Sequence, residues 1–223
     1  MNDIIKKKSL FKKRAILDII MKFKSEQEKF WAGKFGDKYI NRNFKAQRIK
    51  FVGRDLLINN LTVSTILEIG PNVGHNLDAA KQAFPYAKTF GVEINKKAYK
   101  ILKKRHPAAN KSILDFNTKK KFDLVIITGV LSHQSQNILK KIYKKIYKLT
   151  SKYIYLADYF NPYPHEVKYR GFNDRLTKRD FAKEIWKMYP NLKLLDYGFY
   201  WKQDPHLKGQ CDDVNWFLFK KNK

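Results

Sequence analysis

Residues 65–77 read Thr65-Ile66-Leu67-Glu68-Ile69-Gly70-Pro71-Asn72-Val73-Gly74-His75-Asn76-Leu77, and this stretch decides the fold. It opens with a short apolar run typical of a buried β-strand, and Gly70 and Gly74 then space a turn before an amphipathic segment. A strand that leads through such a turn into a helix leaves backbone N–H groups and the positive end of the helix dipole facing outward. The stretch therefore predicts a binding site for a small anionic group.

Downstream of this stretch the apolar pattern alternates between strand and helix. We expect strands at 65–69, 89–93, 112–115, 122–128, 153–157, 192–201 and 213–220, and helices at 75–84, 95–105, 137–149 and 177–189. The run at 122–128 is almost wholly apolar, as expected of a central strand buried on both faces. The last two strands are joined without a helix, so they must pair antiparallel. The pattern predicts an α/β fold with a mostly parallel seven-stranded sheet.

The residues before the first strand are helical in pattern. Residues 1–24 resemble a basic amphipathic helix, which either packs on the domain or lies on a membrane surface. Ser25 and Glu28 have the spacing of a capping box and predict a helix start. Residues 36–43 are expected to interrupt that helix, and 44–60 to form another. We therefore expect a helical extension or lid over residues 1–60 and one α/β domain over residues 61–223.

The formal net charge of +27 raises nucleic acid or an anionic membrane surface as a partner. Only 8 of the 47 basic residues are arginine, and the lysines are spread along the whole chain. Arginine reads guanine edges and binds phosphates in a bidentate manner. A lysine excess of this kind is more typical of a solvated surface, although nucleic acid stays open as a partner.

The remaining composition narrows the class of protein. The single cysteine, Cys211, excludes an internal disulfide and a multi-cysteine metal site, and His75 and His165 lack metal-ligand spacing. The chain contains no run of about 18 apolar residues, so we expect no transmembrane helix. The N-terminus lacks the features of a signal peptide. We expect a cytoplasmic protein that binds no metal.

Acidic residues follow two of the predicted strands. Parallel sheets bind ligands beyond the carboxyl ends of their strands, where the strand order reverses. Glu93 ends the second strand and lies 19 residues after Gly74, close to the offset of about 20 at which an acidic side chain meets a ribose diol. Asp115 ends the predicted third strand. The turn and the two acids together predict a cofactor that contains a ribose.

The glycine spacing separates two kinds of cofactor. Nicotinamide folds carry G-x-G-x-x-G, whereas Glu68-x-Gly70-x-x-x-Gly74 resembles motif I of class I S-adenosylmethionine-dependent methyltransferases. Glu93 and Asp115 match that family's ribose and adenine contacts, and the resemblance covers roughly residues 60–220. It implies a Rossmann-like sandwich that binds S-adenosylmethionine. The implied cofactor contacts are Glu68, Gly70, Asn72, Gly74, Asn76, Glu93, Ile94, Asp115, Phe116 and Thr128.

A narrower resemblance lies outside the cofactor motif. The blocks at 30–43, 161–164, 169–181 and 196–199 are similar to methylases associated with pseudaminic acid biosynthesis. This resemblance implies transfer of a methyl group to an oxygen or nitrogen of a sugar or nucleotide-activated sugar in surface glycan biosynthesis. Arg170, Arg175 and Arg179 lie within ten residues of one another and predict planar donors for a phosphate or carboxylate. The predicted substrate contacts are Trp31, Tyr39, Arg42, Asn43, Tyr159, Tyr169, Arg170, Arg175 and Arg179.

Methyl transfer from a sulfonium is an in-line displacement, and a hydroxyl acceptor also needs a base. His133, just after the fourth strand, is the first candidate because an imidazole titrates near neutral pH. Asp158, at the end of the fifth strand, is the alternative. Two other functions stay open: an RNA methyltransferase that uses the basic surface, and a cofactor-binding scaffold without catalysis. Thr128-Gly129-Val130-Leu131 lacks the Asn/Asp-Pro-Pro-aromatic signature, which argues against methylation of base amino groups.

Overall fold

A computed structural model describes residues 23–44, 51–206 and 212–222 of the chain. The predicted helix over residues 1–24 lies almost wholly outside the described residues, as does Cys211. Within the described ranges, none of the helices has both the length and the apolar character needed to cross a membrane.

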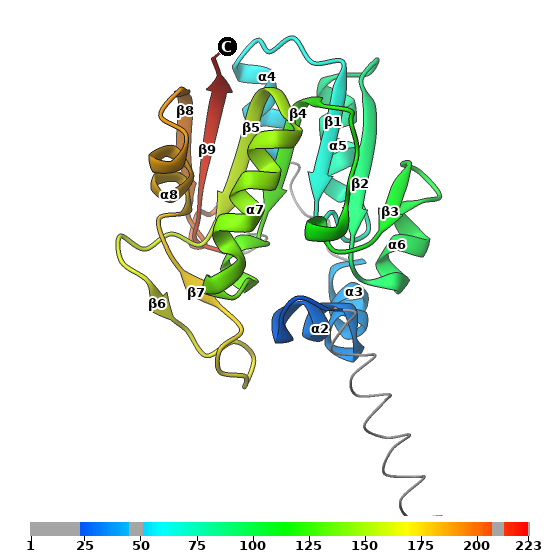
Figure 1. Cartoon of the computed structure of the whole chain (residues 1–223), viewed down its shortest axis with the longest axis vertical. Helices are drawn as coiled ribbons and strands as arrows, with labels where there is room; N and C mark the ends of the chain where they lie inside the picture. The colour runs from blue at the N-terminus through cyan, green and yellow to red at the C-terminus, as the bar shows by residue number, and fades with distance from the viewer. Residues whose placement is uncertain (1–22, 45–50, 207–211, 223) are drawn as a thin grey trace, which may run out of the picture.

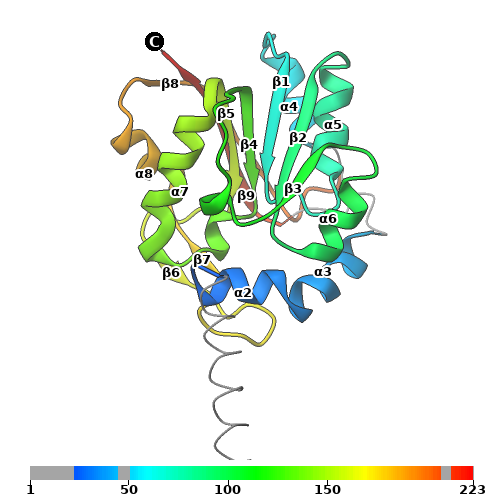
Figure 2. The same cartoon turned by 45° about the vertical axis from the view of Figure 1, so that its right-hand side comes forward.

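Seven strands form one sheet in the order β3-β2-β1-β4-β5-β9-β8 (Figures 1 and 2). Strands β1 to β5 pair in parallel, whereas β9 runs antiparallel to both of its neighbours. The predicted mostly parallel sheet with an antiparallel last strand is therefore confirmed. The strand bounds are Thr65–Ile69 (β1), Lys88–Glu93 (β2), Ala108–Asn110 (β3), Phe122–Thr128 (β4), Thr150–Asp158 (β5), Leu192–Tyr200 (β8) and Val214–Lys221 (β9).

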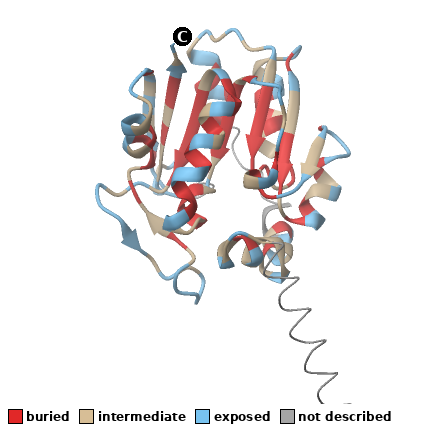
Figure 3. Ribbon diagram, in the orientation of Figure 1, coloured by how far each residue is buried: buried red, intermediate tan, exposed pale blue. Residues whose placement is uncertain are grey.

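Helices cover both faces of this sheet, and the central strands are buried between them (Figure 3). Alternate residues of β4 supply the two cores: Leu124 and Ile126 pack on one face, and Val125 and Ile127 on the other. The helix bounds are Phe51–Ile58 (α4), His75–Ala83 (α5), Lys96–Leu102 (α6), Gln136–Leu149 (α7) and Phe181–Met188 (α8). Helices α7 and α8 pack on the Val125 face, and α4 and α5 pack on the other. The strand order reverses between β1 and β4: β2 and β3 follow on one side of β1, and β4 and β5 on the other. A ligand site is expected where the order reverses.

Two helices precede this core and lie across the carboxyl ends of the strands (Figures 1 and 2). Helix α2 spans Glu26–Ala32 and α3 spans Lys34–Phe44. The predicted helix start is confirmed, because the Ser25 hydroxyl accepts a hydrogen bond from the N–H of Glu28. The predicted interruption at 36–43 is wrong, because α3 runs through it. Arg42 and Asn43 lie in the last turn of α3, and their side chains fall outside the described structure.

Two other predictions of local structure are wrong because a polar side chain caps a different turn. Residues Ile113–Asp115 form a short 3-10 turn, η1, rather than a strand, and the Ser112 hydroxyl accepts from the N–H of Leu114 at its start. Thr177 lies in a small strand, β7 (Thr177–Lys178), which pairs with β6 (His165–Glu166). Helix α8 begins after Asp180, whose carboxylate accepts from the N–H of Lys183.

Candidate active site

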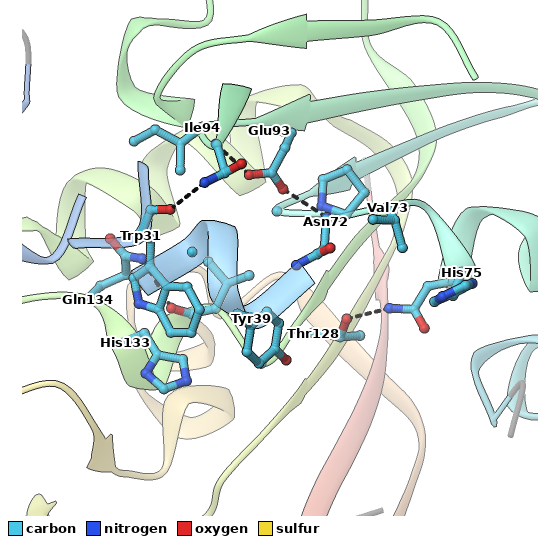
Figure 4. A pocket seen from close by; sticks show the side chains of 17 residues that line it. Trp31, Tyr39, Asn72, Val73, His75, Glu93, Ile94, Thr128, His133 and Gln134 are labelled. Carbon is cyan, nitrogen blue, oxygen red and sulfur yellow. Dashed lines mark hydrogen bonds between the residues drawn. The ribbon is translucent and has the colours of Figure 1, made fainter. Parts of the chain in front are cut away.

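A cavity of about 160 Å³ lies at the carboxyl ends of β1, β2 and β4, under α2 and α3 (Figure 4). This is the point where the strand order reverses, as the sequence predicted. We name it the cofactor cavity. Its lining residues are Trp31, Gly36, Tyr39, Gly70, Pro71, Asn72, Val73, His75, Asn76, Glu93, Ile94, Asn95, Thr128, Gly129, Val130, His133 and Gln134.

The turn after β1 brings backbone close to the cavity. Gly70 has φ +70°, and a Cβ at this position would lie 2.6 Å from Cγ2 of Val130. Asn72 has φ +52°, in the left-handed region that asparagine tolerates better than most side chains. The N–H of Asn72 donates to Oε2 of Glu93 at 2.8 Å, so the turn is fixed to the end of β2. The result is a narrow backbone cradle that a larger residue at Gly70 would fill.

Glu93 joins this cradle to the helix that follows β2. Its second carboxyl oxygen accepts from the N–H of Asn95 at 2.7 Å, and Asn95 in turn caps α6. Burial raises the pKa of Glu93 to about 7, although the bonds from Asn95 and Asn72 favour the ionised form. Glu93 faces the cavity (Figure 4) and can accept hydrogen bonds from a ligand diol.

A second buried acid lies behind the cavity. The Asn76 amide donates to Oε1 of Glu68 at 2.8 Å and to the hydroxyl of Thr128 at 2.7 Å. In the part of the chain that is described, Oε2 of Glu68 has no hydrogen-bond partner. Burial raises the pKa of Glu68 to about 8. Because ionised carboxylates lose hydration when buried, a nearby cation would stabilise them, and two such acids suit a cationic ligand.

The chemistry of these donors fits S-adenosylmethionine, which carries an ammonium, a sulfonium and a ribose diol. A backbone cradle that only glycine leaves open and a buried carboxylate with an unused oxygen would both serve that group. Among the residues described, no group of three or more metal-ligating side chains is present.

His133 closes one wall of the cofactor cavity, at the end of the short turn η2 (Leu131–His133) after β4. Its Nδ1 lies 2.6 Å from the carbonyl oxygen of Arg175. A carbonyl only accepts, so Nδ1 carries the hydrogen, and Nε2 of the neutral ring is left as the proton acceptor. Burial lowers the pKa of His133, which keeps the ring neutral at pH 7. The ring packs against Trp31 and Tyr169, with centroids 4.7 and 4.8 Å away.

Asp158 lies behind this turn and lines neither the cofactor cavity nor its neighbour described below. One carboxyl oxygen accepts from the N–H of Leu131 at 2.8 Å and of Ser132 at 3.3 Å. The other accepts from the N–H of Tyr159 at 2.8 Å. Its oxygens are therefore committed to backbone groups, and Asp158 braces the turn that carries His133. The geometry argues against the alternative that Asp158 is the base.

A second cavity of about 470 Å³ shares His133 and Gln134 with the first. We name it the acceptor cavity. Nε of Arg175 is buried, and within the described residues it has no hydrogen-bond partner. Most of the other side chains are uncharged hydrogen-bonding groups. The lining residues are Gln27, Ser132, His133, Gln134, Ser135, Gln136, Pro164, Glu166, Asp174, Arg175, Leu176, Thr177 and Arg179.

Six of the ten predicted cofactor contacts line the cofactor cavity: Gly70, Asn72, Asn76, Glu93, Ile94 and Thr128. Glu68 lies directly behind it. Gly74, Asp115 and Phe116 do not line it. Gly74 caps α5 and faces Leu102, Phe116 packs in the core against Phe90, and the exposed carboxylate of Asp115 pairs with Lys24 at 3.1 Å. Asp115 does not reach the cofactor cavity because residues 113–115 form the η1 turn instead of the predicted strand.

The predicted substrate contacts divide between the two cavities and the surface. Trp31 and Tyr39 line the cofactor cavity beside His133 (Figure 4). Tyr169 packs on His133, and Arg175 and Arg179 line the acceptor cavity.

Three of the predicted substrate contacts are engaged by other side chains of the protein. Both Nε and an Nη of Arg179 bond to Glu184, at 2.8 and 2.7 Å. Tyr159 donates its hydroxyl to Asp212 at 2.7 Å. Arg170 is exposed and lies over the ring of Tyr169.

Several lining residues were not predicted. Asn95 could have been predicted from the sequence. It caps the helix that follows the strand ending in Glu93, and this position places the backbone of Asn95 beside the ligand site. Gln27 and Gln134 carried none, since they reach the cavities only through tertiary packing. The Gln27 amide donates to the carbonyl of Asp174 at 3.1 Å, which ties α2 to the loop after β5.

Comparisons with known proteins agree with this geometry. Residues 67–152 match the family model described as a methyltransferase domain. An S-adenosylmethionine-dependent methyltransferase from Clostridium acetobutylicum ATCC 824 superposes with a TM-score of 0.61 at 12% identity, over 85% of this chain and 100% of that chain. The 1,6-didemethyltoxoflavin-N1-methyltransferase of Burkholderia thailandensis, with bound S-adenosylhomocysteine, gives 0.65 at 10% identity over 84% of each chain.

A third solved structure is similar to a comparable extent. The N-methyltransferase NodS of Bradyrhizobium japonicum WM9, in complex with S-adenosylhomocysteine, gives a TM-score of 0.58 at 14% identity over 83% of this chain and 98% of that chain. A comparison with curated proteins finds no match.

The fold and the site define a class I methyltransferase sheet with a nucleotide-type cavity at its switch point. Residues 67–152 match a methyltransferase domain, and the whole sheet has the fold of solved S-adenosylmethionine-dependent methyltransferases.

Proposed function

We propose that the protein methylates an oxygen or nitrogen of a sugar, or of a nucleotide-activated sugar, held in the acceptor cavity. The observation that carries the proposal is the position of His133, whose ring forms part of the wall of both cavities. The similarity of four sequence blocks to methylases associated with pseudaminic acid biosynthesis supports surface glycan precursors as the source of this acceptor.

The lining of the acceptor cavity supports a polyhydroxylated acceptor. Six uncharged side chains can donate or accept hydrogen bonds there: Gln27, Ser132, Gln134, Ser135, Gln136 and Thr177. A sugar ring presents hydroxyls that both donate and accept, which matches such a set. Arg175 adds a buried N–H donor that suits a phosphate or carboxylate on the acceptor. Arg179 is held by Glu184, so we assign it to shaping the cavity rather than to binding the anion.

Each residue of the cofactor cavity has a role in this proposal. Gly70 and Asn72 form the backbone cradle, and Glu93 accepts hydrogen bonds from the ribose diol. S-adenosylmethionine supplies an electrophilic methyl group on a sulfonium. Trp31 and Tyr39, from the N-terminal helices, pack over the cavity and exclude water.

His133 moves the proton. Its Nε2 takes the proton of the acceptor hydroxyl as the oxygen attacks, while Nδ1–H stays bonded to the carbonyl of Arg175. The lowered pKa keeps the ring able to accept that proton at neutral pH. Asp158 holds the turn in place through backbone N–H groups.

The test is His133→Ala, assayed for methyl transfer to a panel of sugar nucleotides and, by calorimetry, for binding of S-adenosylhomocysteine. Loss of a general base lowers kcat about 10²- to 10⁴-fold, and we expect the variant to bind S-adenosylhomocysteine within a few-fold of the parent. His165→Ala is the matched control, because His165 is exposed in β6 and lines neither cavity. Unchanged kcat in His133→Ala would exclude its role as base. Transfer by the parent to no member of the panel would exclude the sugar acceptor.

A further inference from the structure

A basic groove of about 480 Å³ lies between α7 and η1, outside both cavities. Its base is apolar, formed by half-buried Leu114 and buried Ile138. Its walls carry five lysines and one carboxylate. The lining residues are Lys24, Leu114, Asp115, Ile138, Lys141, Lys144, Lys145 and Lys148.

Two of the five lysines are engaged within the protein. Lys24 pairs with Asp115 at 3.1 Å. Nζ of Lys145 donates to the carbonyl of Phe116 at 2.6 Å and to the side chain of Asn117 at 2.9 Å. Burial and then the charge of Lys148 lower the pKa of Lys145. The only carboxylate of the groove is therefore already neutralised, and Lys145 is fixed in place.

The other three lysines, Lys141, Lys144 and Lys148, are exposed and have no hydrogen bond or ion pair within the described ranges. They occupy successive turns on the same side of α7. Lys144 and Lys148 are four residues apart, as are Lys141 and Lys145, and like charges at that spacing destabilise a helix. An external row of anions would remove this repulsion.

We propose that this groove binds the phosphate backbone of a nucleic acid. At a rise of about 1.5 Å per residue, Lys141 and Lys148 are about 10 Å apart along α7. One strand of duplex DNA carries a phosphate about every 3.4 Å of helix axis, so about three phosphates align with three lysines. A single small anion would meet only one or two of them.

The chemistry of the lining decides what kind of polyanion fits. Lysine is a point charge without the planar fork that reads guanine, and the groove contains no aromatic ring on which a base could stack. Binding is therefore through the backbone and independent of sequence. The apolar residues of the groove, Leu114 and Ile138, are half-buried and buried rather than exposed, which disfavours insertion into a bilayer. This inference does not depend on the identity of the methyl acceptor.

The test compares two triple variants of the full chain that lose the same charge. Lys141→Gln/Lys144→Gln/Lys148→Gln alters the groove, and Lys96→Gln/Lys97→Gln/Lys100→Gln alters the exposed lysines of α6, which line none of the three cavities described here. The probe is a short fluorescein-labelled DNA duplex of mixed sequence, titrated by fluorescence anisotropy between about 50 and 200 mM salt. Circular dichroism melting checks that both variants fold.

We expect the groove variant to bind at least tenfold more weakly at low salt, with the slope of log K against log salt smaller by about 2 to 3. The α6 variant should stay within about threefold of the parent. Equal weakening by both variants would mean that net charge alone acts, and would overturn the proposal. So would an unchanged affinity in the groove variant. Displacement of the DNA by poly-glutamate at equal charge concentration would also overturn it, because it would assign the groove to acidic peptides.

Discussion

The affinity for the cofactor should depend on pH through Glu93. Its pKa is raised to about 7 by burial, and only the ionised carboxylate accepts hydrogen bonds with both oxygens. At pH 6, one unit below that pKa, about nine in ten molecules are protonated, so the affinity for S-adenosylhomocysteine should be about tenfold lower than at pH 8.5. In Glu93→Gln the affinity should be low at every pH, and the step near pH 7 should be absent.

Calorimetry from pH 6 to 8.5, in pairs of buffers that differ in ionisation enthalpy, measures both the affinity and the protons released. Glu68→Gln is the control, because it removes the other buried acid and should retain the step near pH 7. An affinity of the parent that does not change between pH 6 and 8.5 would refute the reasoning. So would a change near pH 7 in Glu93→Gln that equals the change in the parent. The stability of the unliganded protein should change in the opposite direction to the affinity: it should fall as the pH rises. A raised folded-state pKa contributes stability below the unfolded value of 4.5, and up to about 3 kcal/mol of it is lost as the pH rises through 7.

Two substitutions test the packing around the site. Gly70→Ala should lower the affinity for S-adenosylhomocysteine at least tenfold and destabilise the fold by about 1–3 kcal/mol in urea, since its Cβ meets Val130 at φ +70°. Gly171→Ala, with φ +87° and nothing within 4 Å, isolates the backbone strain, and equal effects on affinity would contradict the clash. Arg179→Met should destabilise the protein by about 1–3 kcal/mol, because it leaves half-buried Glu184 with only the hydroxyl of Tyr143 and no cationic partner. An unchanged urea midpoint would show that this ion pair contributes nothing.

The sheet could be predicted because its signals are short-range. The apolar runs of β1 and β4 and the helix cap at Asn95 depend only on neighbouring residues, and each is observed. Two of the errors lie where a polar residue caps a turn that the apolar pattern did not predict. Ser112 caps a 3-10 turn instead of continuing a strand, and Asp180 caps α8 instead of Thr177. Which polar residue caps a turn depends on tertiary packing, which cannot be read from the sequence.

The cofactor half of the site was predictable for a related reason. Parallel strands bring their carboxyl ends to one edge, so residues that directly follow β1, β2 and β4 converge whatever the rest of the chain does. The acceptor half has no such rule. It forms where α2, the turn after β4 and the loop after β5 meet, and these segments are about 30 to 150 residues apart. Arg175 and Arg179 looked equivalent in the sequence, yet only Arg179 has a carboxylate beside it.

The role that we propose for His133 depends on one contact that no sequence pattern encodes. Its position after β4 gives a histidine at the right edge of the sheet, but a histidine is useful as a base only if the nitrogen that faces the substrate lacks a proton. The carbonyl of Arg175, 42 residues away, fixes that tautomer by taking the hydrogen of Nδ1. The side chain of the same residue lines the acceptor cavity. The backbone that sets the base and the side chain offered to the acceptor therefore belong to one residue, so a displacement of this loop would alter acceptor binding and proton transfer together.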